Sequence, residues 1–166
     1  MFFEFLYWTI GRLIKWVFRL QVEGLENLPK HGALLCPNHA SDWDPVLIGV
    51  CLPHDYHLRI MAKEGLFHNR ALAWLIRKLG AFPVTRGTAD IQSVKTAMQV
   101  IKDGQNLLIF PEGTTIRNGL GYVDGLPPHA HSGIAVIGVR SGATLIPVFA
   151  DGPKKPFRKH RIIFGK

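Results

Sequence analysis

The sequence predicts a single α/β domain, with a mixed and mostly buried sheet flanked by helices. Short apolar runs alternate with helical patterns along the chain, as in folds where strands and helices succeed one another. Hydrophobic residues make up 47% and charged residues 19% of the 166 residues, so the chain can bury a core of its own. The sequence contains no repeat or interdomain linker, and its length suits one domain.

Residues 1–20 differ from the rest of the chain. In a helix, their charged side chains fall within an arc of roughly 80° and leave the remaining surface apolar and aromatic; they are Glu4, Arg12, Lys15 and Arg19. The charges interrupt the segment too often for a membrane span, and they come too late for a secretory signal. We therefore expect an amphipathic membrane-interface helix over 1–20 and the main domain over 21–166. A helix packed on that domain is the alternative.

The remaining elements follow from apolar runs and helical periodicity. Strands are expected at 20–24, 33–37, 58–62, 81–84, 106–110, 144–149 and 161–164. Helices are expected at 43–52, 69–79, 90–102 and 132–141. Proline in the run LIPVF indicates an edge or bulged strand there, or plain core. The chain ends on the strand-like run RIIFGK, which would also suit a domain truncated at its C-terminus.

The charge balance points to an anionic partner. Twenty Lys and Arg against twelve Asp and Glu give a net charge of +8, which suits nucleic acid, a phosphorylated substrate or an anionic lipid surface. Cys36 and Cys51 lack the CxxC spacing of a zinc ribbon, so we expect no metal and no disulfide framework, but two buried thiols in a reducing environment. Six of the eight histidines are expected at the surface or in turns: His31, His54, His57, His68, His129 and His160.

The first candidate catalytic motif is NHASDWD, residues 38–44, directly after the apolar run ALLCP. An α/β fold places reactive groups where a strand ends and a helix begins. There Asp44 could hold the tautomer of His39, and His39 could act as a general base on a substrate hydroxyl. In the other interpretation Asp44, Ser41 or Asp42 is a helix N-cap, with Pro45 in the first turn.

Two later motifs suit an anionic substrate. In GAFPVTR a strand runs into Arg86, which could bind phosphate oxygens or lie at the surface. FPEGTT closes the strand LLIF, where Gly113 lets the backbone approach a ligand and Thr114 and the amides offer donors. Glu112 could accept hydrogen bonds from substrate hydroxyls or from Arg86. An ordinary turn is the alternative for this segment.

Together and in this order, these motifs resemble the glycerolipid acyltransferases typified by 1-acylglycerol-3-phosphate acyltransferase. NHASDWD is similar to the family's NHxxxxD block, GAFPVTR to GxFPxxR, FPEGT to FPEGTR, and LIPV to VPV. The resemblance covers about residue 20 to the end. It implies a fold like that of the glycerol-3-phosphate acyltransferases, a thioester donor (acyl-CoA or acyl carrier protein) and a lysophospholipid acceptor, with no cofactor. With the amphipathic segment over 1–20 and two reduced thiols, we expect a peripheral or monotopic protein on the cytoplasmic side of the cell membrane.

The resemblance assigns roles to individual residues. His39 and Asp44 would be catalytic, and Arg86, Glu112 and Gly113 would bind the acceptor's glycerol phosphate, with Lys63 as a further phosphate ligand. Two positions depart from the family pattern. Thr115 stands where FPEGTR has arginine, so the phosphate contact would rest on Arg86, Lys63 or a repositioned Arg117. His131 stands where many members have lysine.

These residues leave other functions open. The acceptor could be another lyso-lipid, such as lyso-ornithine lipid, because relatives of that kind vary at the Thr115 position. A nucleic-acid-binding module would use the net charge and the basic run KKPFRKHR, but it leaves NHASDWD and FPEGT unexplained. An α/β hydrolase would need a GxSxG elbow, which the sequence lacks. A noncatalytic lipid-binding relative would be expected to lose His39 or Asp44.

Overall fold

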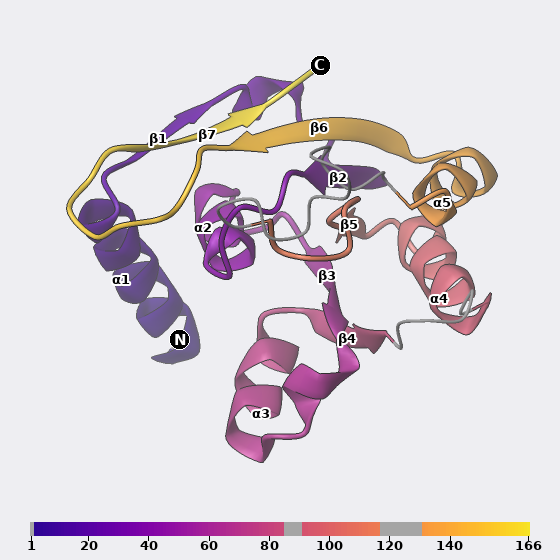
Figure 1. Ribbon diagram of the computed structural model, residues 1–166, viewed down its shortest axis with the longest axis horizontal. Helices are drawn as coiled ribbons and strands as arrows, with labels where there is room; N and C mark the ends of the chain where they lie inside the picture. Colours follow the sequence, from indigo (N-terminus) through magenta and orange to yellow (C-terminus); the bar gives the residue numbers. More distant parts are fainter. Residues whose placement is uncertain (1, 85–90, 117–130) are drawn as a thin grey trace.

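The computed structural model describes residues 2–84, 91–116 and 131–166, with side chains from Thr9 onward. In these residues it shows a seven-stranded sheet in the order β1-β7-β6-β2-β5-β3-β4 (Figure 1). The strands are β1 (Leu20–Glu23), β2 (Ala33–Pro37), β3 (Leu58–Lys63), β4 (Ala81–Val84), β5 (Asn106–Leu108), β6 (Thr144–Ala150) and β7 (His160–Phe164). All the predicted strands are present within two residues of their expected bounds, which confirms the α/β class.

The sheet is mixed, as predicted. Five neighbouring strands, β6, β2, β5, β3 and β4, run parallel, and β7 pairs antiparallel with β6. The expectation that LIPVF forms an edge strand is wrong, because β6 lies between β2 and β7. Pro147 is tolerated since antiparallel pairing with β7 begins only at Val148, and the Pro147 carbonyl accepts a bond from Gly165 N–H. The position therefore needs an acceptor and no donor.

Helices cover both faces of the sheet (Figure 1). They are α1 (Phe2–Val17), α2 (Asp44–Cys51), α3 (Arg70–Lys78), α4 (Ile91–Lys102) and α5 (Gly133–Ser141). Leu35 and Leu108 point into the core formed with α1 and α2. Leu34 and Leu107 point into the opposite core, formed with α4 and α5. Successive residues of a strand face opposite sides, so buried strands of this kind are apolar at every position.

The N-terminal helix is shorter than the expected 1–20. It ends at Val17, and β1 begins at Leu20 after Arg19 adopts a φ of 43°. One side of α1 packs on the domain through Ile14 and Val17. Another side exposes apolar residues, with Leu13 57% and Trp16 67% exposed. The helix is thus both packed and amphipathic, and within the described residues no helix has the length and apolar character of a membrane span.

The turn between α3 and β4 explains one glycine of GAFPVTR. Gly80 has a φ of 85°, and a Cβ there would lie 2.3 Å from the Leu58 carbonyl oxygen. Only glycine fits this close approach at a left-handed backbone position. The turn brings β4 beside β3, so that Lys63 and Val84 are partners in register. Arg86 follows two residues later and lies outside the described residues.

Candidate active site

The candidate site lies at the carboxyl ends of β2 and β5, which are neighbours in the sheet. After β2 the chain passes through α2 to β3, on the far side of β5; after β5 it returns through α5 to β6, on the far side of β2. Such a reversal of winding opens a crevice beyond the strand ends in α/β sheets. NHASDWD follows β2 and FPEGTT follows β5, so the topology brings the two motifs together.

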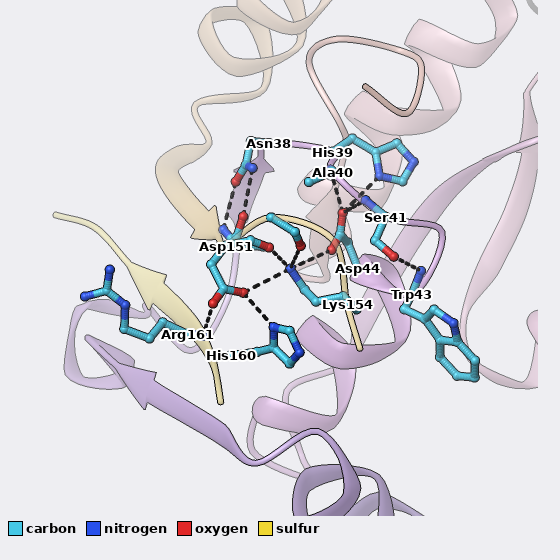
Figure 2. Close-up of polar contacts among 12 residues, drawn as sticks. Asn38, His39, Ala40, Ser41, Trp43, Asp44, Asp151, Lys154, His160 and Arg161 are labelled. Carbon is cyan, nitrogen blue, oxygen red and sulfur yellow. Dashed lines mark hydrogen bonds and ion pairs between the residues drawn. The ribbon is translucent and has the colours of Figure 1, made fainter. Parts of the chain in front are cut away.

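His39 and Asp44 form the pair that the sequence predicted. The Nδ1 atom of His39 lies 3.3 Å from Oδ2 of Asp44, and the two side chains are 13% and 0% exposed (Figure 2). With Nδ1–H donating to the carboxylate, Nε2 is left as the basic nitrogen. The geometry therefore suits general-base catalysis at Nε2.

Asp44 does not act as the N-cap of α2. The helix begins at Asp44 itself, with Trp43 at the N-cap position and no capping side chain. The Asp44 carboxylate turns back toward the preceding loop, where Oδ2 accepts hydrogen bonds from the backbone N–H groups of Ala40 at 2.8 Å and Ser41 at 2.7 Å (Figure 2). These bonds and the contact with His39 fix the carboxylate against the imidazole, so the catalytic interpretation of this motif is favoured over capping.

The segment after β5 holds His39 from the other side. The ring of Phe110 stacks on the imidazole with centroids 3.9 Å apart. Glu112 Oε2 accepts a bond from the His39 backbone N–H at 2.9 Å, and the His39 carbonyl accepts one from Ile116 N–H at 2.8 Å. Glu112 was expected to bind substrate hydroxyls or Arg86; this bond gives its carboxylate a further role in holding the backbone of His39.

Thr115, the residue that replaces the family's arginine, contacts His39 directly. Its Oγ1 lies 3.0 Å from Nε2 of His39 and 3.0 Å from Oδ1 of Asp42, so its single proton can be donated to either acceptor. A hydroxyl oxygen therefore occupies the position that a general base at Nε2 requires of its substrate. The sequence motif indicated only that a positive charge was lost at this position.

Gly113 lies against the side chain of His131. Gly113 has a φ of 65°, and a Cβ there would lie 2.6 Å from Nε2 of His131. The backbone N–H of His131 donates to the Pro111 carbonyl at 3.0 Å, which ties the segment before α5 to the FPEGTT turn. The left-handed backbone conformation favours glycine at 113, and the end of the exposed His131 side chain lies against it. The sequence alone gave His131 no role.

A cleft of about 1450 Å³ opens beside these residues. Its polar part includes Glu112, Thr114, Thr115 and His131 next to His39, and Lys63 from the end of β3 lines it too. The rest of the lining is largely apolar and comes from α2, β3, α3, α4 and α5; it includes Val46, Val50, Leu58, Ile60, Leu72, Ile76, Val94 and Ile137. A lining that is polar beside His39 and largely apolar elsewhere suits a substrate with a charged head and a hydrocarbon chain.

Neither cysteine is a competing nucleophile. Burial raises the pKa of Cys36 to about 11 and that of Cys51 to about 12, the latter against an opposing effect of Lys15. Cys36 is half-buried, Cys51 is buried and both are free; their raised pKa values favour the protonated thiol near neutral pH, which is the less nucleophilic form. Within the described residues no group of three His, Cys, Asp or Glu side chains could hold a metal ion.

Sequence reasoning missed one part of the site. The Asp44 oxygen that faces away from His39, Oδ1, lies 3.3 Å from Nζ of Lys154, and both side chains are 0% exposed (Figure 2). His160, expected at the surface or in a turn, is 5% exposed and contacts Asp151. Both residues belong to the basic run KKPFRKHR, whose composition is typical of a solvated surface. A signal existed in Asp151, which supplies a carboxylate just before the run.

The Acyltransferase family model matches residues 19–151. The chain belongs to the acyltransferase family. A 1-acyl-sn-glycerol-3-phosphate acyltransferase of Bacillus subtilis is 31% identical over 86% of this chain and 69% of its own length. The crystal structure of a 1-acyl-sn-glycerophosphate acyltransferase, PlsC, from Thermotoga maritima matches 98% of this chain and 68% of that one, with a TM-score of 0.72 and 25% identity.

These findings confirm the predicted family, the α/β fold and the enzyme class of an O-acyltransferase. Other relatives are longer or differ in substrate. The chain spans 45% of the 1-acyl-sn-glycerol-3-phosphate acyltransferase of Streptococcus pneumoniae, to which it is 29% identical. It is 32% identical over 65% of its length to a lyso-ornithine lipid O-acyltransferase of Pseudomonas aeruginosa. The acyltransferases similar to this chain thus act on lyso-lipids of more than one kind.

Proposed function

We propose that this acyltransferase transfers a fatty acyl group from a thioester to the free hydroxyl of 1-acylglycerol-3-phosphate, which gives phosphatidic acid for phospholipid synthesis. The observation that carries the proposal is the His39–Asp44 pair: Nε2 of His39 faces a hydroxyl oxygen in the lining of a largely apolar cleft. The names of the relatives support the acceptor. Lyso-ornithine lipid is the second acceptor to test, because a relative is named for it and Thr115 replaces the family's arginine.

In this reaction His39 takes the proton of the acceptor hydroxyl at Nε2 while Asp44 stabilises the imidazolium. The acceptor oxygen attacks the thioester carbonyl carbon, and the tetrahedral intermediate collapses with cleavage of the C–S bond. The imidazolium then returns its proton to the departing thiolate, so His39 is restored. Acyl-CoA and acyl carrier protein both supply such a thioester, and the reaction needs no further cofactor.

In this scheme Thr115 marks the position of the acceptor hydroxyl. The substrate displaces the Thr115 hydroxyl from Nε2, and the Asp42 carboxylate, 3.0 Å from Oγ1, keeps the displaced hydroxyl bonded. The acceptor phosphate would then lie among the residues that the family resemblance assigns to it: Arg86, Lys63, Gly113 and Thr114. We propose further that the exposed apolar side of α1 docks the protein on the membrane, so that a lipid acceptor enters the cleft without crossing water.

The first prediction concerns the catalytic pair. His39→Ala should abolish transfer from acyl-CoA or acyl carrier protein to 1-acylglycerol-3-phosphate, and Asp44→Asn should cripple it, because general-base catalysis is worth about 10²–10⁴-fold. Thioester consumption with and without each lyso-lipid measures both activity and acceptor choice. Consumption only with lyso-ornithine lipid would reassign the acceptor, and a fully active His39→Ala protein would overturn the site.

A rapid-quench arm tests direct transfer. Because Thr115 Oγ1 lies 3.0 Å from Nε2, it could itself accept the acyl group instead of the lipid. Direct transfer predicts no acyl-protein after quenching and an active Thr115→Val protein. An acyl group trapped on Thr115, Ser41 or a cysteine would indicate a covalent mechanism in place of direct transfer. If the group is on Thr115, the Thr115→Val protein should also be inactive.

A further inference from the structure

The side chain of Lys154 is buried, which is unusual for a lysine. Its side chain is 0% exposed, and its Nζ lies 3.3 Å from Oδ1 of Asp44. Burial of a lysine is costly unless its charge is paired and its three donors are used. Here the ammonium is surrounded by acceptors: Asp44 on one side, and Asp151 and the Gly152 carbonyl, at 3.0 Å, on the other (Figure 2).

The two oxygens of Asp44 have different partners. Oδ2 accepts bonds from Ala40 and Ser41 N–H and faces Nδ1 of His39. Oδ1 is buried and makes no hydrogen bond, and the positive charge that faces it is that of Lys154. Removal of the ammonium would therefore leave the outer oxygen of a fully buried carboxylate without a compensating charge.

Lys154 is itself fixed from outside the catalytic motifs. Its Nζ donates to the Asp151 carbonyl and lies 3.2 Å from Asp151 Oδ1. That same Oδ1 is 3.2 Å from Nδ1 of His160, and Oδ2 accepts a bond from Arg161 N–H at 3.0 Å. A continuous set of polar contacts thus runs from the β6–β7 hairpin to the imidazole of His39 (Figure 2).

We propose that Lys154 is a positioning residue for the acyl transfer reaction: it compensates the charge of Asp44 from behind and holds the carboxylate in the orientation that His39 needs. This inference rests on the proposed function for its kinetic part. Because Lys154 is 0% exposed, it does not touch either substrate. Its removal should lower kcat and leave the KM for thioester and lyso-lipid unchanged.

The test is a double-mutant cycle on the full chain with Lys154→Met and Asp44→Asn, measured with 1-acylglycerol-3-phosphate and acyl-CoA. Lys154→Met should lower kcat by about 10- to 100-fold, the range known for outer groups that orient ligands at metal sites. In the Asp44→Asn background, Lys154→Met should have no further effect on kcat, because a neutral amide has replaced the carboxylate that Lys154 faces. Equal factors in both backgrounds, or an unchanged kcat of the single variant, would overturn the role.

Lys155→Met is the matched control. Its side chain is exposed and adjacent in sequence, so the variant loses the same charge without touching the buried contacts. It should keep the kcat of the wild-type protein. A loss in Lys155→Met equal to that in Lys154→Met would show that the charge of the hairpin, and not the contact with Asp44, matters.

A second readout needs no substrate. Urea unfolding of the same four proteins should show that Lys154→Met destabilises the wild-type protein far more than the Asp44→Asn protein, because only the former leaves a buried charge unpaired. If the single lysine variant does not fold, a folded double variant supports the proposal and an unfolded one contradicts it. A wild-type protein that transfers no acyl group would remove the proposed function, while this unfolding cycle would still decide whether Lys154 serves Asp44.

Discussion

At the scale of single residues, the imidazole of His39 is held in place by side chains from separate parts of the chain. Asp44 lies five residues away and sets the Nδ1 side. Phe110 and Glu112, which follow β5, hold the ring and the backbone. Lys154, from the β6–β7 hairpin, faces the outer oxygen of Asp44. The imidazole is therefore held by packing and hydrogen bonds together, as the proposed general base would require.

Arg86 carries the prediction for acceptor binding. Arg86→Ala should raise the KM for 1-acylglycerol-3-phosphate far more than the KM for the thioester. The lost charge-assisted hydrogen bonds should weaken acceptor binding by about 2–3 kcal/mol. Steady-state kinetics with each substrate varied in turn measure the split. Arg140→Ala, which removes an exposed arginine from the last turn of α5, should change neither value. Equal increases in both KM values for Arg86→Ala would refute a role on the acceptor alone.

At the scale of elements, the sequence predicted the strands and helices well because each has a strong local signal. The runs ALLCP and NLLIF are apolar at consecutive positions, as strands buried on both faces must be. The pair of motifs was also predictable, since both follow such strands. The helix expected over 1–20 ended early because Phe18 enters the core, where it is 5% exposed, and Leu20 begins a strand.

What the sequence could not predict depends on strand order. The place of β6 between β2 and β7 is a non-local fact, and it decides that Pro147 is not on an edge strand. The same order folds the 151–159 loop back against Asp44, which buries Lys154. In sequence, Lys154 belongs to a run of cations, and composition favours exposure for every member of such a run. Its partner Asp44 is more than a hundred residues away.

The exposed side of α1 leads to the prediction for membrane docking. Leu13 and Trp16 are 57% and 67% exposed, and Trp16 packs edge-on against Phe157 of the β6–β7 hairpin, itself 62% exposed. Replacement of Leu13 and Trp16 by serine should release the protein from anionic vesicles and lower activity on membrane-embedded acceptor, because apolar burial at the interface is lost. Flotation with vesicles measures the binding, and a short-chain soluble acceptor should still be used.

The control for this prediction lies on another helix. Val139 of α5 is 83% exposed, so Val139→Ser removes apolar surface elsewhere and should leave flotation unchanged. Melting curves of all variants should show folded protein at the assay temperature, with a small decrease where the edge-on contact between Trp16 and Phe157 is lost. If α1 only packs on the domain, the Leu13 and Trp16 variant will float like the wild-type protein, which would exclude docking through this side of the helix.

At the scale of the whole molecule, the sheet joins two apolar cores to one polar edge. The cores on either face contain residues of the same strands at alternate positions, such as Leu34 and Leu35. The carboxyl ends of β2 and β5 then present His39 and Glu112 above a rigid support. Burial in these cores changes the pKa of a titratable group on folding. Such groups make the stability of the entire fold depend on pH.

Three groups in or against the cores, the half-buried Cys36 and the buried Cys51 and Tyr56, set the sign of that dependence. Burial raises the pKa of Cys36 from 9.0 to about 11, that of Cys51 from 9.0 to about 12 and that of Tyr56 from 10.0 to about 12. In the unfolded chain these groups lose their protons near their ordinary values. Between about pH 9 and pH 12 these three groups hold more protons in the folded than in the unfolded state, so their contribution to the free energy of unfolding falls as the pH rises.

The prediction is a loss of stability above about pH 9 that depends on the thiols. Urea unfolding at about pH 8 and about pH 10 should show a smaller decrease for the Cys36→Ala/Cys51→Ala protein than for the wild-type protein, because the double variant has lost two of the groups that keep their protons on folding. Tyr56 and the lysines titrate alike in both proteins, so they cancel from the comparison. Equal decreases would mean that the two thiols ionise as readily in the folded protein as in the unfolded chain, which their burial on the two faces of the sheet should prevent.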